Sequence, residues 1–491
     1  MSDPRDRVLW FGAPASPTQL TEFINRGLAV TAADSANPLA DVRGARAAVA
    51  NIGSTGNAPL LGMVTLFAGR LLDHGLMIDI VTPDDATTGH VQKQIGVVAT
   101  FLGVQLHTNP ASAALAEAIA RHDAGPAPQL DLEIFVPGNR EDVLPGDRIL
   151  FQRAFPQCSS ITLVELGGGR SDARVFAVHM TVARSKIGAW PQPAFAKIDR
   201  REKIAVEYAN YRECAERFIP FGLRPNIETM VVGHARSLLV GNFVDRSESL
   251  WDLARRHVAG PAITALLEET LGGWRDQGYA QDPLTGSVAA EMRKAGLWDP
   301  DRINGDYVAR ADRDGVAHTP GTLWAGLAAL EQCYRIAPIH GDLNGENVRV
   351  RGNSAILIDL ASVSKGPLTA DLAALETWLA FELPPETNPE AFFDPEWTAV
   401  IERLYNPQAF RHPPGPSRPA TRFAWMEEVV RQIRRMGIAV QSCASEYQTA
   451  VAVQLLRRCQ WADGCPGDRG RRAAGYRIAA RLVDNLMGDD I

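Results

Sequence analysis

The sequence of 491 residues predicts an α/β domain with a parallel sheet, followed by a small β-rich lobe and a large helical lobe. Three observations lead to this prediction. Up to about residue 122, short apolar runs alternate with longer segments of helical periodicity, which is typical of helices layered on a sheet. Residues 123–148 concentrate Pro, Gly and Asn turn signals, which indicates a linker. Strand-like runs then continue to about residue 244, and the remainder is mostly helical.

The first 122 residues contain strand-like runs and helix candidates in alternation. We expect strands at 8–11, 28–31, 47–50, 77–81 and, more weakly, 104–107, and helices at 18–26, 58–74, 90–102 and 112–122. This pattern resembles the receiver domain of bacterial response regulators. The acidic residues of a receiver are missing, because the first strand is followed by Gly12 and Ala13 and the third by Asn51, Ile52 and Gly53. We therefore expect a receiver-like domain without phosphoacceptor chemistry.

Composition excludes several classes of protein. Hydrophobic residues make up 46% of the chain, so a disordered or fibrous protein is excluded. The net charge of −7 has the wrong sign for a protein that binds nucleic acid or an anionic membrane. The longest apolar stretch, 58–69, is shorter than the roughly 20 residues of a membrane span, and the N-terminus lacks the features of a secretory signal. Six scattered cysteines indicate free thiols, and we expect a cytoplasmic protein.

The strongest chemical signal is the segment 339–348, which reads Ile-His-Gly-Asp-Leu-Asn-Gly-Glu-Asn-Val. Asp342 and Asn347 lie five residues apart on one loop, and Asp359 follows the apolar strand expected at 355–358. Kinases use this spacing to hold a base and two metal ligands around a terminal phosphate. The segment resembles the catalytic loop of the aminoglycoside phosphotransferase branch of the protein-kinase-like fold. It is most similar to the kinase-like ternary-complex-associated domains of bacterial conflict and signalling systems.

The resemblance implies a role for each of these residues. Asp342 would be the catalytic base that orients the acceptor hydroxyl, while Asn347 and Asp359 would hold Mg²⁺. His340 and Asp371 would support the loop, with Asp371 at the start of the helix that follows a Gly-Pro element. Each side chain alone could be a turn or cap residue, but their shared register favours the catalytic interpretation.

The lobe before the helical region offers residues for ATP. Lys197 ends a strand that resembles the Val-Ala-Ile-Lys strand of kinases and would contact the α- and β-phosphates. The helix expected at 201–218 would supply its partner, for which we choose Glu207 with Glu213 as the alternative. The backbone from Asn242 to Val244 would hydrogen-bond the adenine. A hairpin expected to surround the phosphates carries Gly167, Gly168, Gly169 and Ser171.

Departures from the family pattern limit what the resemblance implies. Asn344 stands where protein kinases place a lysine and aminoglycoside kinases a histidine, so charge stabilisation in the transition state is expected to be weaker or differently supplied. No Ala-Pro-Glu segment follows Asp359, which indicates a constitutive site without a switchable activation loop. A run of arginines near the C-terminus is expected to be a solvated helical face. It comprises Arg457, Arg458, Arg469, Arg471, Arg472, Arg477 and Arg481.

The predicted organisation is a receiver-like domain at 1–122, a linker at 123–148, a kinase-like N-lobe and hinge at 149–244, and a helical C-lobe at 245–491. The predicted function is Mg-ATP-dependent transfer of the γ-phosphate to a hydroxyl of a small molecule or protein. The N-terminal domain is a candidate site for a protein partner. Two alternatives stay open: a nucleotide-binding pseudokinase scaffold in bacterial signalling or conflict systems, and nucleotidyl transfer with ATP reversed.

Overall fold

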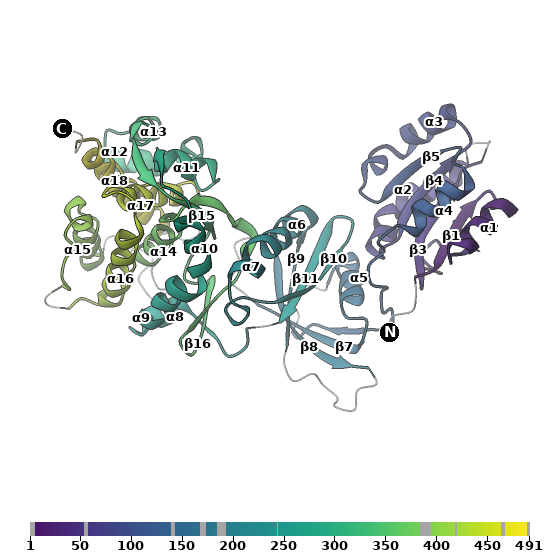
Figure 1. Ribbon diagram of the computed structural model, residues 1–491, viewed down its shortest axis with the longest axis horizontal. Helices are drawn as coiled ribbons and strands as arrows, with labels where there is room; N and C mark the ends of the chain where they lie inside the picture. Colours follow the sequence, from purple (N-terminus) through teal and green to yellow (C-terminus); the bar gives the residue numbers. More distant parts are fainter. Residues whose placement is uncertain are drawn as a thin grey trace. The chain divides into compact units, whose positions relative to one another are not determined.

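The computed structural model, drawn in Figure 1, divides the chain into two compact units. The first comprises Met1–Tyr208 and Asn226–Asp245, and the second Ala209–Pro225 and Arg246–Ile491. The structure describes residues 5–53, 57–138, 143–166, 173–183, 193–242, 244–382, 394–417, 420–462 and 467–488.

The first unit begins with the predicted α/β domain, a five-stranded parallel sheet in the order β2-β1-β3-β4-β5. Its strands are β1 (Arg7–Gly12), β2 (Ala29–Ala32), β3 (Ala45–Asn51), β4 (Met77–Thr82) and β5 (Val104–Thr108). Flavodoxin and CheY share this strand order, which serves many functions. The α/β fold class is therefore confirmed, while the resemblance to receivers stays a prediction.

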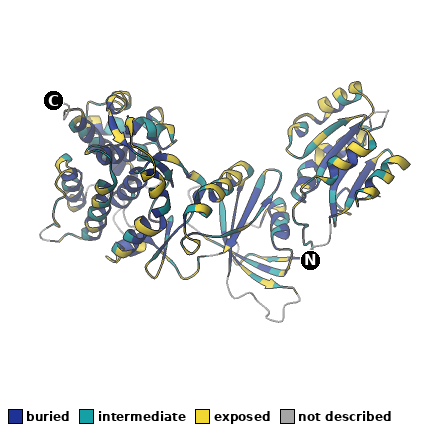
Figure 2. Cartoon of the chain, in the orientation of Figure 1, coloured by how far each residue is buried: buried dark blue, intermediate teal, exposed yellow. Residues whose placement is uncertain are grey.

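Alternate residues of each strand point to opposite faces of this sheet and fill two separate cores. Leu9 and Phe11 belong to the core that also contains α2 and α3, whereas Val8 and Trp10 belong to the core with α1 and α4. The dark blue strands in Figure 2 are buried between these helix layers. The helices are α1 (Pro17–Asn25), α2 (Ala58–Asp73), α3 (Asp85–Ile95) and α4 (Ser112–Ala120).

A second, mostly antiparallel sheet follows in the order β10-β11-β9-β8-β7-β6. Its strands are β6 (Glu133–Phe135), β7 (Cys158–Glu165), β8 (Arg174–Val182), β9 (Ala194–Arg200), β10 (Ile227–Val232) and β11 (Arg236–Asn242). The segment expected as a linker differs from that expectation, because it contains β6, paired in parallel with β7, and the first residues of α5 (Pro145–Ala154). Helix α6 (Arg201–Asn210) follows β9 and continues as the π-turn Tyr211–Ala215 and α7 (Glu216–Phe218).

A buried polar seam joins the two parts of the first unit. Arg153 of α5 donates from Nη1 to the carbonyl oxygens of Asp73, at 2.9 Å, and of Val232, at 2.7 Å. The Asp73 carboxylate accepts in turn from the backbone N–H of His234 at 2.8 Å. Because a buried guanidinium is stable only with such partners, this seam fixes the α/β domain to the β-sheet of the same unit.

The second unit is mainly helical and carries short hairpins. Its strands are β12 (Glu248–Ser249), β13 (Leu284–Gly286), β14 (Gln332–Tyr334), β15 (Ile336–Ile339), β16 (Val348–Arg351), β17 (Ser354–Leu357) and β18 (Ser364–Pro367). Its helices after residue 246 are α8 (Leu250–Arg255), α9 (Gly260–Ala265), α10 (Gly272–Tyr279), α11 (Val288–Lys294), α12 (Gly305–Arg313), α13 (Pro320–Ala329), α14 (Ala370–Phe381), α15 (Pro395–Leu404), α16 (Ala424–Val440), α17 (Glu446–Arg458) and α18 (Asp468–Gly488). Helix α14 packs against α16 and α17 and is buried along almost its whole length.

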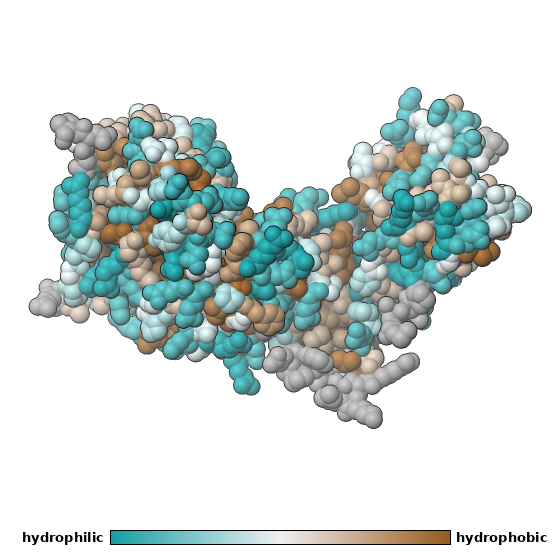
Figure 3. Space-filling model, viewed as in Figure 1, coloured by the Kyte–Doolittle hydropathy of each residue, from teal (hydrophilic) through white to brown (hydrophobic). Residues whose placement is uncertain are grey.

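The surface mixes hydrophilic and hydrophobic side chains. In the face drawn in Figure 3, hydrophilic and hydrophobic residues are interspersed. Exposed large apolar side chains such as Leu66, Val97 and Phe221 lie on elements far apart in the sequence. Within the described ranges, no helix is long and apolar enough to cross a membrane.

Candidate active site

The predicted catalytic loop connects β15 to β16 and is held from below by Asp371, in the first turn of α14. The Asp371 carboxylate accepts from the backbone N–H groups of His340, at 2.6 Å, and Gly341, at 3.0 Å. Gly341 has a φ of +75°, and a Cβ at this position would collide with the Ser362 carbonyl oxygen. Burial raises the pKa of Asp371, while the two backbone N–H bonds oppose that rise. The loop can therefore turn tightly over a buried acid.

The imidazole of His340, fully buried, ties this loop to the end of β17. Its Nδ1 accepts from the backbone N–H of Asp342 at 3.3 Å, which leaves Nε2 to donate to the Ile358 carbonyl oxygen at 2.9 Å. This assignment of the tautomer follows from the direction of the backbone bond. One ring thus fixes Asp342 relative to the residue that precedes Asp359.

Asn347 also joins the catalytic loop to the end of β17. Its Nδ2 donates to the Asp342 carbonyl oxygen at 2.9 Å, and its own carbonyl accepts from the Ile358 N–H at 2.9 Å. Asp359 follows in the left-handed region, with a φ of +60°, and is exposed. The structure therefore brings Asp342, Asn347 and Asp359 together, as the spacing of the sequence predicts.

The pKa of Asp342 responds to the charged groups that lie near its carboxyl group. Burial is the main cause that raises the pKa of the Asp342 carboxyl, and Asp359 adds to the rise. The charge of Arg457 is the largest effect that lowers it. Arg457, on α17, places Nη2 at 3.5 Å from Asp342 Oδ1.

Arg457 is not among the predicted site residues, although it lies beside Asp342. The expectation of a solvated arginine face is wrong for the inner members of the run, because the side chains of Arg457, Arg458, Arg471 and Arg472 are at most 13% exposed and all four pair with acids. Arg457 lies 115 residues from Asp342 in the sequence, so no local motif links the two. The pairing arises only when α17 packs against α14.

The donor set of Asn347 and Asp359 fits Mg²⁺. Because Nδ2 of Asn347 is engaged by the Asp342 carbonyl, its Oδ1 faces away from that bond as an oxygen acceptor. No group of three or more His, Cys, Asp and Glu side chains that could hold a metal ion occurs in the part of the chain that the structure describes. Mg²⁺ is commonly held by one or two protein oxygens together with water and phosphate oxygens, so a two-residue set suits it.

The residues predicted for ATP lie in the first unit, whereas the catalytic loop lies in the second. Lys197 Nζ, on β9, is 2.9 Å from Glu207 Oε2, on α6, and both side chains are 10% exposed. Glu213, the alternative partner, is exposed in the π-turn. Asn242 ends β11 and accepts through Oδ1 from the Asn226 N–H at 2.5 Å. Val244 lies two residues after Asn242. The residues predicted to contact the phosphates lie outside the described residues; they are Gly167, Gly168, Gly169 and Ser171.

Comparison with known proteins supports the resemblance that the catalytic-loop residues carry. Residues 252–404 match the model of the phosphotransferase enzyme family, which confirms the likeness to aminoglycoside phosphotransferases over that segment. No curated protein matches the chain by sequence. The match does not reach the N-terminal domain, so the receiver resemblance and a protein partner there stay predictions.

Several solved structures are similar to the chain. A thermostable mutant of the aminoglycoside phosphotransferase APH(4)-Ia, bound to ADP and hygromycin B, is 13% identical with a TM-score of 0.36 and covers 68% of this chain and 96% of its own. The phosphotransferase APH(3'')-Id from Streptomyces rimosus is 18% identical with a TM-score of 0.29, covering 57% and 96%. Amicoumacin kinase in complex with AMP-PNP, Ca²⁺ and Ami is 13% identical with a TM-score of 0.31, covering 67% and 88%.

Proposed function

We propose that the protein is an Mg-ATP-dependent phosphotransferase that transfers the γ-phosphate to a hydroxyl group. One observation carries the proposal: Asp342 and Asn347 lie on a loop that is tied, through His340 and Asn347, to the end of β17, where Asp359 follows. Asp371 holds the same loop, and the whole arrangement lies in a segment that matches a phosphotransferase family. Phosphoryl transfer depends mainly on position and charge, and a rigid loop of this kind supplies both.

In the proposed reaction, the acceptor oxygen forms a bond to the γ-phosphorus. The bond from that phosphorus to the bridging oxygen breaks, and its electron pair leaves on ADP. The proton of the acceptor hydroxyl passes to the Asp342 carboxylate, which also orients the hydroxyl. The backbone bonds that Asp342 makes to His340 and Asn347 keep the base in place during this step.

Two further sets of residues would bind ATP. Asn347 and Asp359 would hold Mg²⁺, which when bound neutralises charge on the phosphate oxygens. Lys197 would contact the α- and β-phosphates, and its ion pair with Glu207 orients the ammonium group on β9. The backbone of Asn242 and Val244 would hydrogen-bond the adenine.

The test is to incubate the protein with cell extract and ATP labelled at either the γ- or the α-phosphate. We expect γ-label to appear on an acceptor with the wild type and to be lost with Asp342→Asn, which keeps the shape of the side chain. Asp301→Asn is the matched control, because Asp301 is 85% exposed and far from the loop in sequence.

Other outcomes would replace the proposal. Label that transfers only from the α position would favour nucleotidyl transfer. Absence of transfer, with Mg-ATP binding intact in calorimetry, would favour a nucleotide-binding scaffold. Transfer that survives in Asp342→Asn would contradict the assignment of the base.

A further inference from the structure

Asn344, two residues after Asp342, is engaged in holding the loop. Its Nδ2 donates to the Asp342 carbonyl oxygen at 3.1 Å. Its Oδ1 accepts from the backbone N–H groups of Glu346, at 2.9 Å, and Asn347, at 3.0 Å. An uncharged side chain turned into its own loop in this way cannot supply positive charge to a reacting phosphate.

Arg457 brings a positive charge to the same place from α17. Its Nη2 is 3.5 Å from Asp342 Oδ1, and its side chain is only 12% exposed. Its Cζ also lies 5.5 Å from the centroid of the Trp461 ring, which is within the range of a cation–π contact. Among the residues that the structure describes, Asp342 is its hydrogen-bond partner, through one long contact. A guanidinium has five N–H donors, so this contact leaves Arg457 with donors to spare.

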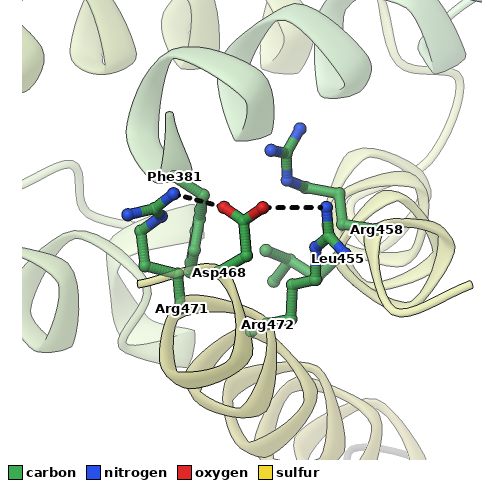
Figure 4. Close-up of a pocket in the computed structure, with 7 residues that line it drawn as sticks. Phe381, Leu455, Arg458, Asp468, Arg471 and Arg472 are labelled. Carbon is green, nitrogen blue, oxygen red and sulfur yellow. Dashed lines mark hydrogen bonds and ion pairs between the residues drawn. The ribbon is translucent and has the colours of Figure 1, made fainter. Parts of the chain in front are cut away.

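The neighbouring arginines have other partners. Arg458 pairs with Glu382, and Arg477 and Arg481 both pair with Glu402. Figure 4 shows Arg471 and Arg472 turned toward Asp468. The hollow between them measures about 10 Å³, which is room for one water molecule at most. Arg458, Arg477 and Arg481 therefore pair with acids on other segments, whereas Arg471 and Arg472 pair with an acid of their own helix α18. Arg457 differs from all of them because its acid is the predicted base.

The backbone of Trp461, whose ring Arg457 contacts, is itself held in place. The Trp461 carbonyl oxygen accepts from the Tyr307 hydroxyl at 2.8 Å and from Arg472 Nη1 at 2.6 Å. Arg472 is held in turn by the Asp468 carboxylate at 3.6 Å. The ion pair of Arg472 with Asp468, drawn in Figure 4, thus helps to hold the Trp461 backbone.

We propose that Arg457 is a further catalytic residue, which contacts the transferring phosphoryl group and offsets the negative charge that develops there. The inference rests on the proposed function. An acceptor oxygen hydrogen-bonded to Asp342 lies about 3 Å from that carboxylate, and the phosphorus it attacks lies roughly 3–3.5 Å further on. A guanidinium 3.5 Å from the same carboxylate is within reach of that group.

The pairing of Arg457 with the base is compatible with this role. Phosphoryl transfer goes through a loose transition state in which the charge lies on the phosphoryl oxygens, so a fixed cation contributes more than a strong base does. Arginine also matches phosphate oxygens with two parallel N–H groups, which lysine cannot do. The proposal therefore predicts that both the charge and the shape of the side chain matter.

The test measures hydrolysis of Mg-ATP, with water as the acceptor, by the full-length protein. Arg457→Ala should lower kcat by about 10²–10³-fold, the loss typical of one transition-state donor, while KM for Mg-ATP changes by less than about threefold. Arg457→Lys should recover part of kcat, and added guanidinium ions should partly restore Arg457→Ala. Arg477→Ala is the matched control, because Glu402 keeps Arg481 as a partner. Thermal unfolding of each variant reports whether the fold is kept.

The remaining outcomes separate this inference from the function on which it rests. If Asp342→Asn abolishes hydrolysis and Arg457→Ala does not lower kcat, the role of Arg457 is refuted alone. A rise in KM with kcat unchanged also refutes it, because that result describes ground-state binding of the nucleotide. A wild type that neither hydrolyses Mg-ATP nor transfers the γ-label to an acceptor in cell extract refutes both proposals.

Discussion

The strand ends of the N-terminal sheet and of the catalytic unit use polar side chains in opposite ways. At the end of β3, Asn51 Nδ2 donates to the Ala13 carbonyl oxygen at 3.0 Å and closes the turn that follows β1. After β17, Asp359 is exposed at a φ of +60°, a conformation that costs a non-glycine residue about 1–2 kcal/mol. The first side chain satisfies the backbone, while the second is kept despite strain. Strain alone does not separate the two regions, because Asn109, directly after β5, also has a positive φ, of +41°. What marks the second strand end is an exposed carboxylate tied to the loop of Asp342 and Asn347.

Buried polar contacts between helices support the catalytic loop. The catalytic loop rests on α14, and two buried polar groups at this helix, those of Glu376 and Thr369, are held by α16 and α17. Glu376 pairs with Arg434 at 2.5 Å and accepts from the Tyr447 hydroxyl at 2.8 Å. Thr369, at the N-terminus of α14, donates to Glu446 at 3.0 Å. These contacts transmit the packing of α16 and α17 to the loop.

The largest expected effect tests the strained strand end. Asp359→Gly should lower Mg-ATP hydrolysis at least about 10³-fold, because it removes a predicted metal ligand. Glycine adopts a φ of +60° without strain, so the free energy of unfolding should stay within about 1 kcal/mol of the wild type. Turnover of γ-labelled ATP and urea unfolding measure the two quantities. Full activity in this variant would show that the strain at Asp359 has no catalytic purpose.

The next effect concerns the support beneath the loop. Glu376→Ala leaves Arg434, which is 1% exposed, without its acid and should lower the free energy of unfolding by about 3–5 kcal/mol. The double variant Glu376→Met with Arg434→Met should recover most of this loss, because no unpaired charge remains. Urea unfolding followed by circular dichroism measures both. A loss below about 1 kcal/mol in Glu376→Ala would mean that the pair does not stabilise α14.

The same contrast explains what the sequence could and could not predict. The strands of the N-terminal sheet follow from local apolar runs, and the catalytic loop follows from a fixed spacing. The helix expected at 90–102 instead begins at Asp85, because the Asp84 side chain caps it by accepting from the Thr87 N–H at 2.7 Å. The sequence does not predict strand β6, because its three residues form a strand only through pairing with β7. Arg457 was missed for the same reason, because its partner lies far away along the chain.

A smaller effect is a pH dependence of stability in the helical unit. Burial raises the pKa of Glu446 from 4.5 to about 7. The folded state therefore binds more protons than the unfolded state between these values, and the free energy of unfolding should fall as pH rises through that window. The slope from this group is at most about 1.4 kcal/mol per pH unit. Glu446→Gln should flatten the curve, and an unchanged curve would assign the dependence to other groups.

The smallest effect belongs to the N-terminal strand end. Asn51→Ala removes the hydrogen bond to the Ala13 carbonyl and should lower the free energy of unfolding by about 1 kcal/mol, the usual contribution of one such bond. Mg-ATP hydrolysis should be unchanged, because Asn51 only closes a turn. Asn51→Asp also removes the N–H donor and should behave alike, although it places an acid at the end of the third strand. Loss of hydrolysis in Asn51→Ala would show that this sheet edge takes part in the reaction, and the contrast with Asp359 would fail.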